Sequence, residues 1–177
     1  MKSLLKVLPV IFFLFICTST NYSQEVYEHG YIVKVGDKAP DFLIREASGK
    51  SYMLSELRGS VVMLQFTASW CSVCRKEMPY IESEIWEEGK ELGLKVIGID
   101  RDEPLETVKK FKKDIGVTYP LALDPGAEIF SLFALKEAGV TRNVIIDREG
   151  YIVKLTRLFR MDEFNEMKNI IFTELEK

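Results

Sequence analysis

Apolar runs alternate with segments of helical periodicity along the chain. Residues 61–66, 94–99 and 143–147 are short and mostly apolar, which predicts strands that are buried on both faces. Apolar residues spaced three or four positions apart predict helices over 71–89, 104–115, 127–135 and 162–176. Strands that alternate with helices in this way indicate a sheet with a parallel core.

Turn residues add antiparallel strands to this pattern. A Ser-Gly-Lys turn at 48–50 predicts a small hairpin near the N-terminus, and an Arg-Glu-Gly turn at 148–150 joins strand 143–147 to the run 151–155. A short extended piece is expected at 121–123. The expected fold is therefore α/β. It is a thioredoxin fold with three α/β/α layers, a mixed central sheet, an extra N-terminal β-hairpin and a central α insertion.

Two local signals refine the expected helices. Pro79 lies inside the helix over 71–89 and removes one backbone hydrogen bond, so we expect a kink there. Asp102 is placed to cap the helix over 104–115, and Gly116 to end it. The buried face of that helix is expected to carry Leu105, Val108, Phe111 and Ile115.

The first twenty residues have the pattern of an export signal. Lys2 precedes and Lys6 interrupts the start of an apolar run that is followed by a polar segment at 18–21. The run is shorter than the roughly 20 residues of a membrane-spanning helix. We therefore expect a signal peptide or membrane anchor over 1–20, a polar tether over 21–35, and a thioredoxin-like domain over 36–177. Cys17 is a possible site of lipidation, as in a bacterial lipoprotein; otherwise it is one more small apolar residue.

Composition narrows the class of function. The chain has 177 residues with 47% hydrophobic residues, enough for one domain with a full core. The formal net charge is −3 and no basic stripe is visible, which argues against nucleic-acid binding. The export signal, whether cleaved, lipidated or retained as a tether, places the domain outside the cytoplasm, where disulfide chemistry is common.

The segment from Trp70 to Cys74 carries the candidate chemistry. Cys71 and Cys74 are separated by two residues at the expected start of a helix, so they can close a small disulfide and reopen it. Unpaired backbone N–H groups and the helix dipole favour a thiolate at Cys71. Arg75 and Lys76 add positive charge. The spacing predicts thiol–disulfide exchange with Cys71 as the attacking sulfur.

Two other interpretations of the cysteine pair stay open. A structural zinc site is closed by protein ligands, mostly Cys and His. The chain has three Cys and one His, and Cys17 and His29 lie far from the pair in sequence, so only a metal shared between subunits would fit. A purely structural disulfide is the other interpretation, but so small a ring restricts the unfolded chain little. We expect no metal and no cofactor.

The chain resembles the TlpA/ResA-like family of extracytoplasmic thiol–disulfide oxidoreductases over residues 35–177. The opening motif VGDKAPDF at 35–42 is shared with peroxiredoxins, whereas FTASWCSVCRKEMP at 66–79 is highly specific. The resemblance implies that Cys71 is the nucleophile and Cys74 the resolving thiol. It also implies that Glu77 is partly buried and accepts a proton from Cys74, and spacing by one helical turn agrees. A solvated helix Glu is the alternative.

The same resemblance assigns a substrate-binding surface. Trp70, Ser72 and Val73 lie beside the disulfide, and the loop with Val140 and Thr141 would offer backbone hydrogen bonds to the substrate. The family usually carries a cis-proline at the position of Thr141, in the segment GVTRN. A cis bond before a non-proline residue costs about 3 kcal/mol. Either the Val140–Thr141 bond is trans and the loop is reshaped, or a strained cis bond is held there.

These observations predict a reductase of protein disulfides that a membrane-bound thiol donor regenerates. A peroxiredoxin-like thiol peroxidase is one alternative. That family needs a Thr three residues before its reactive Cys and a Pro further upstream, where this chain has Ala68 and Leu64. A non-enzymatic thioredoxin-fold binding module is the other.

Overall fold

A five-stranded mixed sheet lies at the centre of the protein, as a computed structural model describes it over residues 26–177. In spatial order β5-β4-β3-β6-β7, β3 pairs in parallel with β4 and antiparallel with β6. The strands are β3 (Val62–Thr67), β4 (Lys95–Arg101), β5 (Leu121–Asp124), β6 (Arg142–Ile146) and β7 (Ile152–Arg157). A separate hairpin pairs β1 (Leu43–Arg45) with β2 (Ser51–Met53). The predicted strands, hairpins and mixed sheet are confirmed.

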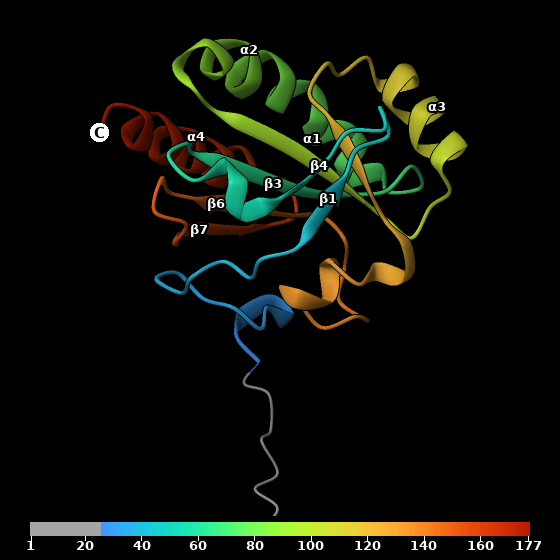
Figure 1. Cartoon of the computed structure of the whole chain (residues 1–177), viewed down its shortest axis with the longest axis horizontal. Coiled ribbons are helices and arrows are strands. Elements are labelled where there is room, and N and C mark those ends of the chain that lie inside the picture. Colours follow the sequence, from blue (N-terminus) through green and yellow to red (C-terminus); the bar gives the residue numbers. More distant parts are fainter. Residues whose placement is uncertain (1–25) are drawn as a thin grey trace, which may run out of the picture.

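The α-helices of the described residues pack on one face of this sheet, and 3-10 helical turns lie on the other (Figure 1). The α-helices are α1 (Ser72–Ile81), α2 (Glu87–Gly89), α3 (Leu105–Ile115) and α4 (Met161–Leu175). Alternate strand residues such as Met63 and Ile145 pack beneath them. Their neighbours Leu64 and Val144 face the other side, against the N-terminal segment and two 3-10 turns, Pro125–Ala127 and Phe130–Leu132. Every residue of β3 is buried, as its nearly all-apolar run predicts.

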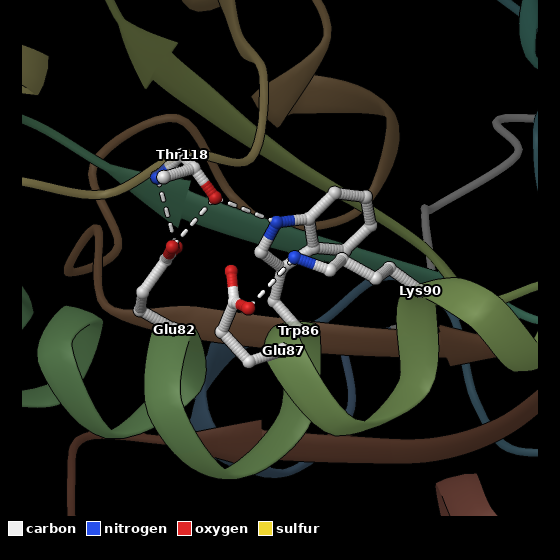
Figure 2. A network of polar contacts seen from close by, with 5 residues as sticks. All are labelled: Glu82, Trp86, Glu87, Lys90 and Thr118. Atoms are coloured by element: carbon white, nitrogen blue, oxygen red, sulfur yellow. Dashed lines mark hydrogen bonds and ion pairs between the residues drawn. The ribbon is translucent and has the colours of Figure 1, made fainter.

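The helix expected over 71–89 continues past Pro79. A π-helical segment, Glu82–Trp86, follows α1 and leads directly into α2. Polar contacts hold this segment against the loop before β5 (Figure 2). Thr118 donates to the Glu82 carboxylate through its N–H and its hydroxyl, and the Trp86 indole donates to Thr118 Oγ1 at 2.8 Å. The helix therefore changes from α-helical to π-helical three residues after Pro79.

Three predictions about the helices are wrong. Asp102 does not cap α3; the N-cap is Pro104, and Asp102 Oδ1 accepts the Gly126 N–H instead. Leu105, the first residue of α3, is 37% exposed rather than buried. The helix expected over 127–135 is replaced by 3-10 turns, although Ile129, Phe130 and Phe133 are buried as predicted. Apolar spacing alone does not distinguish one helical turn from several.

The N-terminal segment is part of the domain from about residue 27, which differs from the polar tether expected over 21–35. Tyr31 and Val33 are buried, and the Tyr31 hydroxyl donates to the Thr156 carbonyl at 2.7 Å. Arg142 is buried under this segment, with its guanidinium 4.4 Å from the Tyr31 ring centroid. A buried charge needs such partners. The expected signal, anchor and Cys17 lie outside the described residues.

Candidate functional site

A disulfide joins Cys71 and Cys74 at the N-terminus of α1. Cys71 is the N-cap residue, and its sulfur accepts the Cys74 N–H at 3.1 Å. Cys71 is 6% exposed and Cys74 is fully buried. The more accessible sulfur therefore lies where the N–H groups and the dipole of α1 stabilise negative charge. This geometry agrees with the predicted order of attack, in which Cys71 reacts with the substrate and Cys74 resolves the intermediate.

The loop between β3 and α1 is fixed by charged side chains around Ser69. Glu103 accepts the Ser69 N–H at 2.5 Å and the Ser69 hydroxyl at 2.6 Å. Arg75 donates to the Ser69 carbonyl through Nε at 2.7 Å, and the Cys71 N–H donates to the Ala68 carbonyl. Arg75 thus ties the first turn of α1 to the loop rather than pointing at the sulfurs. These bonds present the disulfide on a rigid turn.

Thr141 lies against both sulfurs. Its Oγ1 is 3.2 Å from Cys71 Sγ and 3.4 Å from Cys74 Sγ, and the residue is 3% exposed. The peptide bonds of the described residues are all trans, so the Val140–Thr141 bond is trans. Of the two possibilities that the sequence left open, this is the one the structure has. The side chain of Thr141 thus faces the disulfide itself.

An open groove of about 440 Å³ lies next to Trp70, the residue before Cys71, although neither cysteine lines it. Its lining includes Trp70, Arg101, Glu137, Gly139 and Val140. Trp70 is 66% exposed, so it is not part of the hydrophobic core. Ser72 is exposed and Val73 partly so, whereas Val140 is buried. An exposed Trp next to a reactive sulfur is a surface on which a polypeptide can pack.

Glu77 is buried on the inner face of α1, one turn after Cys74. Its carboxyl Oε1 accepts the Asn143 Nδ2–H at 2.7 Å, and the same amide donates to Thr156 Oγ1 at 2.9 Å. Burial raises the pKa of Glu77 to about 7, against the effect of the Asn143 hydrogen bond, which lowers it. The carboxyl can therefore take up or release a proton near neutral pH. The alternative of a solvated helix Glu is wrong, since Glu77 is 2% exposed.

Several polar residues near the site were not singled out from the sequence. Asn143 interrupts an apolar strand, and so does Gln65, whose Oε1 accepts the Tyr119 hydroxyl at 2.8 Å. Asp100 lies next to the last residue of β4 and pairs with Thr67, and burial raises its pKa to about 8. Glu103 follows it in the loop. A polar residue inside a strand that is otherwise apolar is the signal that would have marked the first three, because such a group needs a buried partner.

The raised pKa of Glu77 predicts how stability changes with pH. The carboxyl is neutral in the folded protein up to about pH 7, whereas in the unfolded chain it ionises near 4.5. Folding stability therefore falls as pH rises between these values, by about 3 kcal/mol in total. Glu77→Gln removes this penalty. We expect urea unfolding of the oxidised variant to show a gain over wild type at pH 8 that is absent at pH 4.

Glu149→Gln is the matched control, because Glu149 is exposed in the turn between β6 and β7. It should follow the wild-type pH dependence throughout. The same pH dependence in Glu77→Gln as in wild type would show that Glu77 is not the buried, weakly acidic carboxyl described above.

Comparison with known proteins agrees with this geometry. The model of the AhpC/TSA family matches residues 35–155. The chain belongs to the AhpC/TSA family. It is 31% identical over 147 residues to a thiol-disulfide oxidoreductase ResA of Bacillus cereus, covering 82% of this chain and 83% of that protein. Another ResA, from Bacillus thuringiensis subsp. konkukian, is 32% identical over 150 residues, again covering 82% of this chain and 83% of that protein.

Solved structures give the same family relationship. A solution structure from Bacteroides thetaiotaomicron, described as a candidate protein disulfide isomerase, is 60% identical with a TM-score of 0.81 and covers 84% of this chain and 94% of that chain. A Chlorobium tepidum protein, described as a candidate thiol:disulfide interchange protein DsbE, is 29% identical with a TM-score of 0.72. The match covers 81% of this chain and 99% of that chain. The predicted resemblance to ResA-like thiol–disulfide oxidoreductases and the thioredoxin fold are therefore confirmed.

Residues 26–177 lack two further features. Within this range no group of three or more His, Cys, Asp or Glu side chains is arranged to hold a metal ion. No helix in the same range is long and apolar enough to cross a lipid bilayer. The cysteine pair is joined as a disulfide, which is the oxidised form of the predicted redox couple.

Proposed function

We propose that this AhpC/TSA family member is an extracytoplasmic thiol–disulfide oxidoreductase that reduces protein disulfides. One observation carries the proposal: the disulfide of Cys71 and Cys74 lies at the N-terminus of α1, with the more accessible sulfur at the N-cap. A helix N-terminus lowers the pKa of a thiol and makes it reactive. The named relatives are thiol–disulfide oxidoreductases and support the same chemistry.

The reaction starts from the reduced protein. The Cys71 thiolate attacks one sulfur of the substrate disulfide; a new S–S bond forms, and the substrate's other sulfur leaves as a thiolate that takes up a proton. Cys74 then loses its proton and attacks Cys71, releasing the second substrate sulfur. The substrate gains two electrons and two protons, and the protein is left with the Cys71–Cys74 disulfide.

Glu77 is proposed to accept the proton of Cys74 during the second attack. Its pKa of about 7 and its position one turn after Cys74 on the buried face of α1 support this role. Trp70, Ser72 and Val73 are proposed to contact the substrate from one side of the groove, and Val140 from the other. The groove next to Trp70 and Val140 supports this placement.

Location and electron supply are proposed from the sequence. The apolar run of residues 1–20 is proposed to export the chain, and it is then cleaved, lipidated or retained as a membrane tether. Outside the cytoplasm the oxidised protein needs a source of electrons. A membrane-bound thiol donor is proposed to reduce the disulfide after each cycle, as a protein serving cytochrome c maturation would require.

The reduction potential and two activity assays test the proposal. We expect the purified protein, reduced with dithiothreitol, to reduce insulin disulfides, with a midpoint potential closer to that of thioredoxin, about −270 mV, than to that of a strong oxidant, about −120 mV. Hydrogen peroxide should be consumed no faster than by free thiols, because Ala68 replaces the Thr of peroxiredoxins. Failure of the reduced protein to reduce insulin, or rapid consumption of hydrogen peroxide, would contradict the proposal.

A further inference from the structure

We propose that the hydroxyl of Thr141 hydrogen-bonds the Cys71 thiolate and thereby sets the acidity and reduction potential of the couple. This inference rests on the proposed function and assigns Thr141 a role other than substrate binding. Thr141 Oγ1 is 3.2 Å from Cys71 Sγ and 3.4 Å from Cys74 Sγ, so one hydroxyl contacts both reacting atoms. Both distances lie within hydrogen-bonding range for sulfur.

The direction of these contacts depends on the redox state. In the closed disulfide neither sulfur carries a hydrogen, so the Thr141 hydroxyl can only donate in these two contacts, and disulfide sulfurs are weak acceptors. Two-electron reduction breaks the S–S bond and, with uptake of one proton, gives one thiolate and one thiol. The hydroxyl then donates to the Cys71 thiolate and accepts the S–H of Cys74. A hydrogen bond to a charged acceptor is about twice as strong as a neutral one.

The surrounding structure holds Thr141 in place in the oxidised protein. The Thr141 carbonyl accepts the Leu158 N–H at 3.2 Å, and the next residue, Arg142, donates through Nε to the Gly139 carbonyl at 2.9 Å. Thr141 itself is 3% exposed. The hydroxyl is thus positioned before the electrons arrive, and little rearrangement is needed to solvate the new charge.

The sign of the effect follows from which state gains the stronger bond. The hydroxyl stabilises the thiolate over the thiol, so it lowers the pKa of Cys71. It stabilises the reduced protein over the oxidised one, so it makes the couple less reducing. Removing the hydroxyl should raise the pKa of Cys71 and lower the midpoint potential.

Thr141→Val tests this, because valine keeps the shape and removes the hydroxyl. We expect an approximately tenfold smaller ionisation constant of Cys71, read from the pH dependence of its alkylation by iodoacetamide. The equilibrium constant for reduction by glutathione should fall by a similar factor of about 10, which corresponds to about 30 mV. Thr141→Ser, which retains the hydroxyl, should stay near wild type in both measurements.

Two further variants complete the test. Thr173→Val is the matched control, since Thr173 lies on α4 and its hydroxyl bonds the Asn169 carbonyl within that helix. Thr141→Ala also removes the hydroxyl without adding bulk, and replaces the valine variant if that variant does not fold. Wild-type acidity and potential in either hydroxyl-free variant would overturn the inference, as would a serine variant that behaves like valine.

The two proposals fail in different ways. Alkylation and glutathione equilibration need no protein substrate, so they report on Thr141 even if the wild-type protein does not reduce insulin. An active wild type with unchanged Thr141→Val chemistry refutes only the role of Thr141. An inactive wild type with the expected shifts refutes only the proposed function.

Discussion

We expect Cys71→Ser to abolish insulin reduction, leaving only the uncatalysed background. A serine hydroxyl neither ionises near neutral pH nor forms a bond to sulfur, so the first attack does not occur. Cys74→Ala should instead allow the first attack and stop the cycle there, because no second thiol is present to release the substrate. Reduction of insulin, followed by its precipitation, measures both variants against wild type.

The two variants also differ in what accumulates. Cys74→Ala should be trapped as a mixed disulfide with its substrate, visible as a heavier band on a non-reducing gel, and Cys71→Ser should not. Ser83→Ala serves as the control. Ser83 lies in the π-helical segment after α1, is exposed, and its hydroxyl donates to the Pro79 carbonyl. Full activity in Cys71→Ser, or a trapped substrate on that variant, would overturn the assignment of Cys71 as nucleophile.

Phe66→Ala should destabilise the fold by about 3–5 kcal/mol. Phe66 is fully buried near the end of β3, and its ring centroid lies 5.4 Å from those of both Phe130 and Phe133. Removing the ring loses apolar contacts and leaves a cavity beneath the loop that carries the disulfide. Urea unfolding of the oxidised protein measures the loss.

Tyr151→Ala is the control for this change, because Tyr151 is an aromatic residue that is 44% exposed. We expect it to change the free energy of unfolding by less than about 1 kcal/mol. If Phe66→Ala lost as little free energy of unfolding as Tyr151→Ala, the prediction would be wrong, because the aromatic cluster under the site would have relaxed to fill the space.

The sequence allowed the sheet and the reactive pair to be predicted because both depend on local patterns. An uncharged run such as 61–66 has few ways to avoid water other than a buried strand, and two cysteines at a helix start have a characteristic chemistry. The partners of Glu77 and of the sulfurs were not predictable in this way. Asn143 and Thr141 lie more than 60 residues away in sequence, and only the antiparallel pairing of β6 with β3 brings them to α1.

The errors in the predicted helices have a related cause. Asp102 carries a side chain suited to capping, yet its oxygen bonds Gly126 across the loop, a tertiary contact that outweighs local preference. Pro79 predicts a kink in the long helix; the structure keeps Pro79 inside α1 and has the π-helical segment Glu82–Trp86 after it, which Thr118 contacts from a distant loop.

The buried guanidinium of Arg142 sets a limit on where the protein can be shortened. Arg142 donates to the His29 carbonyl at 2.6 Å and to the Gly139 carbonyl at 2.9 Å. A single side chain therefore links residues 26–35, here called the N-terminal strap, to the segment that carries Thr141. Expression from residue 36 onward would remove the His29 carbonyl that accepts from Arg142 and the Tyr31 ring that packs against its guanidinium. A version trimmed for solution work should therefore begin no later than Val26, so that the strap stays attached to the redox centre.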